Sequence, residues 1–176
     1  MDLKTHIIAS AERAFDQYGF TATGMDKLAE AAQVSSRTLY KHIGSKSELI
    51  AAVLAERTRR FFDHADAQNV DALFASLGAW TRAEGARGCL FLRAKGETSE
   101  ETALVLEAIA GYRERLGALV ALAVSNDLGD VQNTMLVDQI LVLFEGATSA
   151  ASYRGVYSIS AARAAAAVLI EHAKTP

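Results

Sequence analysis

Apolar residues recur at three- and four-residue intervals along most of this chain, which predicts amphipathic helices rather than strands. The first such stretch contains Leu3, Ile7, Ala14 and Phe15 and stops before Gly19, a residue type favoured at helix ends. The one proline is the last residue, so no proline interrupts a helix further in. The pattern predicts an all-α fold of about nine helices, over residues 3–18, 25–32, 36–42, 45–64, 69–84, 89–92, 98–126, 131–153 and 158–173.

Short polar motifs mark the starts of the second, third and fourth helices. Thr23 stands three residues before Asp26 and is the expected N-cap of the second helix. Ser35 is the expected cap of the third, and Ser45 with Glu48 forms a capping box at the fourth. The second and third helices are short and closely spaced, which is typical of a helix-turn-helix.

The formal net charge of -3 does not by itself indicate a nucleic-acid partner, but the charges are unevenly distributed. Residues 31–47 contain Arg37, Lys41 and Lys46 and no acidic residue, whereas residues 61–176 hold 9 basic and 14 acidic residues. A short basic segment on an acidic body is typical of a small surface that binds phosphate. An ordinary solvated surface also accommodates three cations, so charge alone leaves both interpretations open.

No motif in the sequence indicates catalysis. The four histidines, His6, His42, His64 and His172, are scattered, and we find no metal-ligand spacing, nucleophile elbow or phosphate-binding glycine loop. We therefore expect no enzyme activity, no metal site and no cofactor. Cys89 is the one cysteine, no apolar stretch is long enough to span a membrane, and no signal-peptide pattern is present. These features predict a soluble, cytoplasmic protein.

Residues 19–49 resemble the DNA-binding domain of the TetR family of transcriptional regulators. The matching positions are Gly19, Phe20, Thr23, Leu28, Ala29, Val34, Ser35, Thr38, Leu39, Tyr40, His42, Ser45, Lys46 and Leu49. Three positions depart from the family pattern: Gln33 and Arg37 replace glycines, and Ile43 replaces a phenylalanine. A left-handed Gln33 would cost about 1–2 kcal/mol. The resemblance implies a three-helix DNA-binding domain over residues 1–47 and a larger helical regulatory domain, for ligand binding and dimerisation, over residues 48–176.

The resemblance also implies which residues contact DNA. In a recognition helix that enters the major groove, Ser36, Arg37 and Lys41 can project outward, and arginine can bind guanine bidentately. The remaining contacts are expected at the backbone or groove floor. Taken singly, Tyr40 is equally well explained as a core aromatic, and Arg37 or His42 as solvated surface. The expected DNA-binding residues are Thr23, Ser35, Ser36, Arg37, Thr38, Tyr40, Lys41, His42 and Lys46.

The segment from Arg87 to Phe91 is similar to a Gly-Cys element found at the sixth helix of many family members, and it implies a pocket for a small apolar effector. The candidate pocket walls are Phe74, Leu77, Trp80, Cys89, Phe91, Leu106, Ile109, Tyr112, Phe144 and Tyr153. Each of these residues is also explained by simple core packing. Cys89 has a second functional interpretation as a redox sensor, with a small buried thiol as the plainer alternative.

The last two helices carry small residues beside larger apolar ones and are the expected surface of a homodimer. The candidate interface residues are Leu136, Ile140, Leu143, Ala147, Ala151, Ala161, Ala165, Val168 and Leu169. A two-fold dimer requires a palindromic operator, although these faces can also pack within one subunit. The resemblance implies a repressor that an effector releases from DNA. A constitutive DNA-binding protein and a helical enzyme or carrier are the alternatives, and the sequence gives neither the operator, the effector, the regulated genes nor the sign of regulation.

Overall fold

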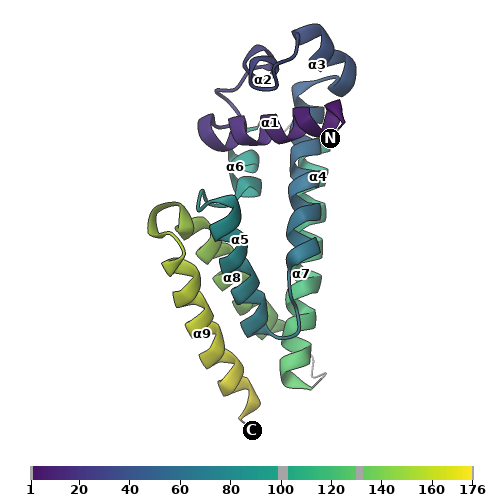
Figure 1. Cartoon of the computed structure of the whole chain (residues 1–176). Helices are drawn as coiled ribbons and strands as arrows, with labels where there is room; N and C mark the ends of the chain where they lie inside the picture. The colour runs from purple at the N-terminus through teal and green to yellow at the C-terminus, as the bar shows by residue number, and fades with distance from the viewer. Residues whose placement is uncertain (1, 99–102, 130–132, 176) are drawn as a thin grey trace. The chain divides into compact units, whose positions relative to one another are not determined.

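The computed structural model describes residues 2–98, 103–129 and 133–175, and in these ranges the chain is helical with short connecting loops (Figure 1). None of the helices described is long and apolar enough to cross a membrane. The all-α prediction is confirmed. The helices within these ranges are α1 (Leu3–Tyr18), α2 (Met25–Ala31), α3 (Ser36–Ile43), α4 (Lys46–His64), α5 (Val70–Glu84), α6 (Leu90–Glu97), α7 (Ala103–Leu128), α8 (Thr134–Arg154) and α9 (Tyr157–Lys174).

The predicted boundaries hold for most helices, and the largest difference concerns the sixth. Helix α6 runs to Glu97, whereas the apolar pattern predicted an end near residue 92. The side chains after residue 92 are mostly polar, so the hydrophobic periodicity gave no sign of the second half of this helix. The predicted starts of the next two helices fall partly at residues 99–102 and 131–132, which lie outside the described residues.

The turn between α1 and α2 is built differently from the sequence prediction. Gly19 ends α1 with a φ of 84°, as expected for a glycine at this position. Helix α2 begins at Met25 with Gly24 as its N-cap, so the prediction that Thr23 caps this helix is wrong. Thr23 is fully buried, and its hydroxyl donates to the Gly19 carbonyl at 2.6 Å. The hydroxyl therefore closes the preceding turn instead of capping the helix.

Packing divides the chain into two compact units. The N-terminal unit comprises residues 1–60 and 90–112, and the C-terminal unit comprises residues 61–89 and 113–176. Helices α4 and α7 each contribute residues to both units. The boundary predicted at residue 47 concerns where DNA binding ends and regulation begins, which packing does not decide, and it stays a prediction.

The N-terminal unit has an apolar core formed by its first helices. The rings of Phe15 and Phe20 stack with their centroids 4.7 Å apart, and Ile7, Leu28 and Leu39 are almost fully buried. Helices α1, α2 and α3 all contact one another. Burial of each of these large side chains stabilises the fold by roughly 1.5–3 kcal/mol. Helices this short are only marginally stable in isolation, so packing in the core stabilises them.

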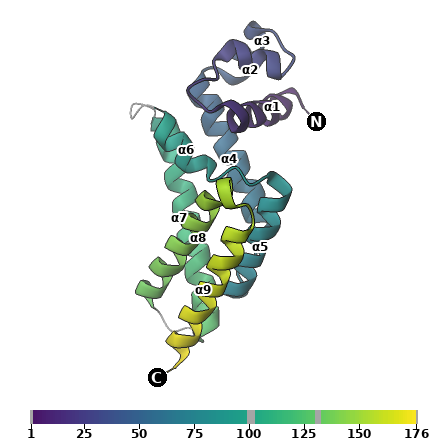
Figure 2. The ribbon, with the colours of Figure 1, turned by 90° about the vertical axis from the view of Figure 1, so that its left-hand side faces the viewer.

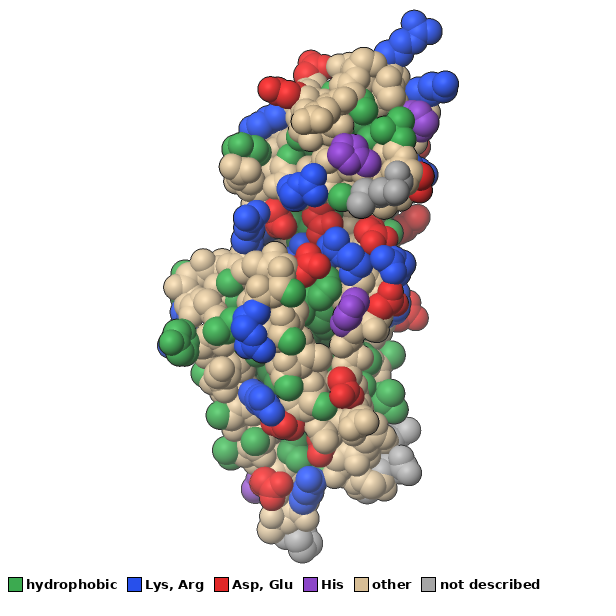
Figure 3. Space-filling model, in the orientation of Figure 1, with side chains coloured by type: hydrophobic (Ala, Val, Ile, Leu, Met, Phe, Trp, Pro, Cys, Tyr) green, Lys and Arg blue, Asp and Glu red, His purple; other side chains and the backbone are tan. Residues whose placement is uncertain are grey.

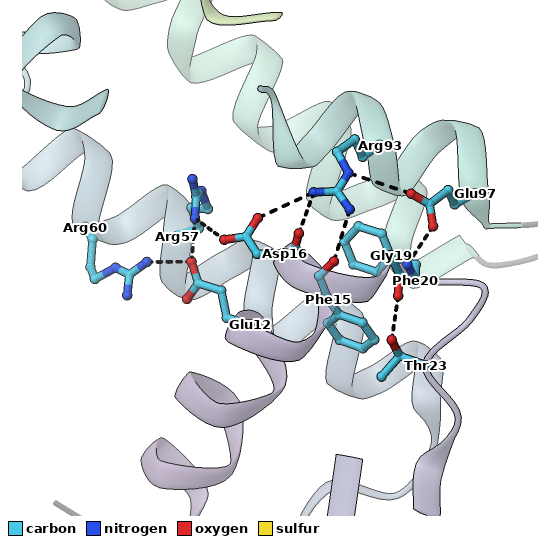
Figure 4. Close-up of polar contacts among 10 residues, drawn as sticks. All are labelled: Glu12, Phe15, Asp16, Gly19, Phe20, Thr23, Arg57, Arg60, Arg93 and Glu97. Carbon is cyan, nitrogen blue, oxygen red and sulfur yellow. Dashed lines mark hydrogen bonds and ion pairs between the residues drawn. The ribbon is translucent and has the colours of Figure 1, made fainter. Parts of the chain in front are cut away.

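A buried ion-pair cluster lies beside this core (Figure 4). Arg57 on α4 donates to the carboxylates of Glu12 at 2.7 Å and Asp16 at 3.4 Å, both on α1. Arg60, one turn further along α4, donates to the same Glu12 oxygen at 2.6 Å. Arg57 and Glu12 are among the few buried charged residues in the described ranges. The cluster fixes α1 against α4, because each buried charge needs its partners.

The C-terminal unit packs α5 and α8 against α9, and α8 and α9 run side by side (Figure 2). Its interior contains an aromatic cluster around Phe61. The centroid of the Phe61 ring lies 5.5 Å from that of Trp80 and 6.0 Å from that of Phe144. The ring centroids of Phe144 and Phe74 lie 5.9 Å apart. Edge-to-face geometry of this kind is favourable beyond simple burial.

Candidate nucleic-acid interface

The turn between α2 and α3 contains one left-handed residue that is not glycine. Gln33 has a φ of 54°, so it adopts the left-handed conformation that the glycine it replaces would favour. The backbone N–H of Val34 then donates to the Ala29 carbonyl at 3.0 Å and closes the turn. A side chain with a Cβ is strained in this conformation. The helix-turn-helix is therefore formed at some cost in stability.

Replacing Gln33 by glycine should stabilise the protein by about 0.5–1 kcal/mol. Relief of the left-handed strain exceeds the entropy that an added glycine gives the unfolded chain. Gln33→Ala is the control, because it shortens the exposed side chain but keeps the Cβ. Urea unfolding measures the free energy of unfolding of both variants. Equal values for the glycine and alanine variants would show that the left-handed backbone at residue 33 is not strained.

Helix α3 begins with a well-formed cap and presents a polar face to solvent. The Ser35 hydroxyl accepts from the Thr38 backbone N–H at 3.1 Å, and Leu39 is fully buried, which anchors the helix to the core. The Ser36 hydroxyl donates to Asp26 at 2.9 Å. Side chains on the open face are exposed at Arg37, Tyr40, Lys41 and His42 and half-buried at Ser36 and Thr38. Lys and Arg side chains project from the end of the unit that α3 forms (Figure 3).

The N-terminus of α4 adds a second cationic position. Ser45 and Glu48 form the predicted capping box: the Ser45 N–H donates to the Glu48 carboxylate at 2.7 Å, and the Glu48 N–H donates to the Ser45 hydroxyl at 3.2 Å. Hydrogen bonds to the Glu48 carboxylate from the Ser45 hydroxyl and from the Ser45 backbone N–H lower the pKa of Glu48. Lys46 is half-buried in the first turn, where burial lowers the pKa of its ammonium and the charge of Glu97 opposes that shift.

The structure brings the expected DNA-binding residues together on α3 and the start of α4, with one exception. The Thr23 side chain is buried, and its hydroxyl donates to the Gly19 carbonyl, so the hydroxyl is not available to a phosphate. The others leave polar groups at the surface beside the capped N-termini of α3 and α4. Such a surface can bind phosphates through cations, hydroxyls and backbone N–H groups, and bases through the exposed α3 side chains.

The expected pocket walls come from both compact units. Phe74, Leu77 and Phe144 are buried in the C-terminal unit with Trp80 beside them. Phe91, Ile109 and Tyr112 belong to the N-terminal unit, where the Phe91 and Tyr112 rings stack at 3.7 Å. Cys89 is half-buried just before α6. Leu106 and Tyr153 are exposed, 41% and 79%, so they do not line an enclosed cavity of the single chain.

The expected dimer residues divide between two stripes of α8 and α9. Leu136, Ile140, Ala147 and Ala151 are buried within the chain, so packing inside one subunit accounts for them, and their assignment to an interface stays a prediction. Leu143 and Leu169 are half-buried, and Ala161, Ala165 and Val168 are exposed. The exposed stripe of α8 passes instead through Met135, Val142, Gly146 and Tyr153. A shallow groove between the helices is lined by residues that include Val142, Gly146, Ala150, Ala161 and Ala165.

Sequence reasoning missed the charged residues that hold the N-terminal unit together, namely Glu12, Asp16, Arg57, Arg93 and Glu97. One signal was present: Glu12 and Asp16 stand four residues apart on the face of α1 that also carries apolar Ala11 and Phe15. Charged side chains on a buried face require partners. Their identity depends on residues more than 40 positions away, which local patterns do not give.

Two comparisons of sequence find short segments similar to known regulators. Residues 7–53 match the model for "Bacterial regulatory proteins, tetR family". A segment of 48 residues is 44% identical to the HTH-type transcriptional activator FasR of Mycolicibacterium smegmatis. That segment is 27% of this chain and 22% of the length of the activator, so the likeness covers a small part of either protein.

Solved structures with similar folds extend over nearly the whole chain. A TetR-family transcriptional regulator from Streptomyces coelicolor superposes with a TM-score of 0.87 at 23% identity, covering 98% of this chain and 90% of its own. A TetR transcription regulator from Haloarcula marismortui gives 0.81 at 15% identity, covering 97% of each chain. Reduced NemR of Escherichia coli gives 0.75 at 21% identity, covering 96% and 97%. At these identities the likeness is one of fold.

Proposed function

Because the N-terminal domain of this chain belongs to the tetR family of bacterial regulatory proteins, we propose that the protein is a transcriptional regulator that binds a palindromic operator as a homodimer and is released by an apolar effector. The observation that carries the proposal is the exposed polar face of α3 beside the N-terminus of α4, on a domain that matches the family. The proposed sign of regulation is repression, which results from occupation of the operator by the protein. The matched FasR is named an activator, and a reporter gene placed behind the operator distinguishes the two signs.

In the proposed complex α3 lies in the major groove. Ser36, Arg37 and Lys41 face base edges, and Arg37 is suited to bidentate contact with guanine. The groups proposed to hold the DNA backbone are Ser35, Thr38, Tyr40, His42 and Lys46. Lys46 adds its charge to the positive end of the α4 helix dipole, which favours a phosphate there. The exposure of Tyr40, at 52%, supports a contact outside the core rather than within it.

The proposed dimer joins the exposed stripes of α8 and α9 from two copies of this chain. Val142 on α8 and Val168 on α9 are 70% and 69% exposed, and Met135 and Tyr153 on α8 are exposed as well, so α8 and α9 offer apolar surface that a partner can cover. Gly146 has nothing within 4 Å of the position a Cβ would take, so a partner helix can approach closely there. A two-fold pair of such faces forms a four-helix contact and places two recognition helices on one operator.

The proposed effector binds in the C-terminal unit near Phe74, Leu77, Trp80 and Phe144. The aromatic rings of this cluster offer apolar contacts of the kind that line ligand sites. Effector binding would favour a conformation in which the two recognition helices no longer fit the operator, by population shift. A thermal-shift screen with apolar and aromatic compounds, followed by addition of each hit to the DNA complex, tests this part.

The DNA-binding proposal is tested by replacing Tyr40 and Lys46 together with alanine. Fluorescence anisotropy with the DNA that flanks the gene, at two salt concentrations, should show tight salt-dependent binding by the wild type. The double variant should bind about tenfold to a hundredfold more weakly, and the loss of Lys46 should reduce the salt slope by about 1.

The matched control is Arg82→Ala, which removes one exposed cation from α5 in the C-terminal unit. It should leave both affinity and salt slope unchanged. Binding that is equally weak on every DNA and unaffected by Tyr40 and Lys46 would overturn the assignment of this face.

A further inference from the structure

The side chain of Arg93 on α6 caps the C-terminal end of α1 (Figure 4). Its two terminal nitrogens donate to backbone carbonyls, Nη1 to Asp16 at 3.2 Å and Nη2 to Phe15 at 3.1 Å. Nη1 also lies 3.7 Å from the Asp16 carboxylate. Carbonyls in the last turn of a helix lack partners within the helix, and a cation there is favoured by the helix dipole. The planar guanidinium thus holds α6 against the end of α1.

One turn further along α6, Glu97 binds the turn that leads into α2. Its carboxylate oxygen Oε2 accepts from the backbone N–H of Phe20 at 2.6 Å and of Thr21 at 3.2 Å, and its backbone carbonyl accepts from the Thr21 hydroxyl at 2.9 Å. A Cβ at Gly19 would lie 2.6 Å from the same carboxylate oxygen. The turn therefore follows a path that fits closely around the Glu97 side chain.

These contacts converge on the segment that sets where α2 begins. Nε of Arg93 also lies 3.7 Å from Oε1 of Glu97, so the two side chains form one connected group. We term this pair the α6 clamp. The turn held by the clamp runs from Gly19 to Gly24, directly before α2. Glu97 is close enough to Lys46 to influence its ionisation, so the clamp also lies near the proposed phosphate contact at the start of α4.

We propose that Arg93 and Glu97 are positioning residues for DNA binding: the α6 clamp holds the α1–α2 turn in the path from which α2 and α3 meet the operator. The inference rests on the proposed function. A turn fixed before DNA arrives need not be ordered on binding, and preorganisation of this kind strengthens association without adding a contact to DNA. In the proposed complex, neither Arg93 nor Glu97 contacts DNA.

The test compares substitutions that break the clamp with substitutions that keep it, all in the full chain. Glu97→Ala removes the acceptor, whereas Glu97→Gln keeps an oxygen that can accept from Phe20 and Thr21. Arg93→Lys keeps the charge but loses the two-pronged geometry, since one ammonium replaces the planar fork. Lys95→Ala removes an exposed cation from the same helix and is the control for charge.

Operator binding by anisotropy should weaken at least about tenfold in Glu97→Ala and Arg93→Lys, with unchanged salt slope, and stay within about threefold of wild type in Glu97→Gln and Lys95→Ala. Amide hydrogen exchange should show faster exchange at Phe20 and Thr21 in Glu97→Ala, while Leu39 in α3 remains protected. This readout separates a local release of the turn from general unfolding.

Clamp-breaking variants that bind the operator as well as wild type, with Phe20 and Thr21 exchanging faster, would overturn the positioning role. Tighter binding by Glu97→Ala would also overturn it, because the carboxylate would then be withholding two N–H groups from phosphate. Failure of the wild type itself to bind any DNA selectively would instead contradict the proposed function, on which the clamp's role depends.

Discussion

Replacing Val168 by glutamate should separate the proposed dimer into monomers and abolish tight operator binding. The side chain is 69% exposed in the single chain, so a carboxylate there costs the fold little. In a two-fold interface the substitution appears twice and buries charge without a partner, which costs about 3 kcal/mol or more and weakens dimerisation about a hundredfold. Loss of the second recognition helix should lower operator affinity by roughly 10²–10⁴.

Ala167→Glu is the matched control for this experiment. Residue 167 is exposed and adjacent in sequence, but it lies about 100° further around α9 and outside the proposed interface stripe. Light scattering at micromolar concentration should report a dimer for wild type and Ala167→Glu and a monomer for Val168→Glu. A wild-type monomer, or dimers for all three proteins, would contradict the proposed interface.

Removal of Arg57 should destabilise the protein more than removal of any surface arginine. Arg57→Ala leaves Glu12 and Asp16 buried without their shared partner, although Arg60 still contacts Glu12 and Arg93 lies near Asp16. We expect a loss of about 3 kcal/mol, at the lower end for a broken buried ion pair. For a chain of this length the loss corresponds to a fall in Tm of roughly 6–12 °C.

Arg59→Ala provides the comparison, because Arg59 also pairs with a carboxylate. It contacts Glu56 at 2.6 Å, but its side chain is 59% exposed, and such surface pairs contribute less than about 1 kcal/mol. Thermal unfolding followed by circular dichroism measures both variants. Similar Tm values for Arg57→Ala and Arg59→Ala would show that the buried cluster does not stabilise the N-terminal unit.

Local sequence signals predicted the helix-turn-helix well because its geometry is encoded within a few residues. Ser45 and Glu48 form the predicted capping box, and Gly19 ends α1 as expected. Each of these features depends on neighbours in sequence. Thr23 is the exception, since its hydroxyl bonds backward to Gly19 instead of forward into α2. A threonine before a helix favours both arrangements, and the sequence did not distinguish them.

The sequence did not separate a possible dimer surface from the core, because α8 is apolar on more than one side. Around α8, Leu136 and Ile140 are buried while Met135 and Val142 are exposed, yet all four are apolar. Hydrophobic periodicity identifies a core face only when the opposite face is polar. The α6 clamp was missed for another reason: Glu97 pairs with Phe20, 77 residues earlier, and such pairing follows from the tertiary fold alone.

In the proposed complex, two copies of this chain bind a symmetric DNA sequence through their α3 helices. Selection of bound duplexes from a pool of random sequence tests it most directly, because it requires no knowledge of the operator or its location. We expect enrichment of one motif with two inverted half-sites, and a changed half-site preference for Arg37→Ala. Recovery of DNA without any enriched motif, or of a motif that Arg37→Ala enriches identically, would contradict it.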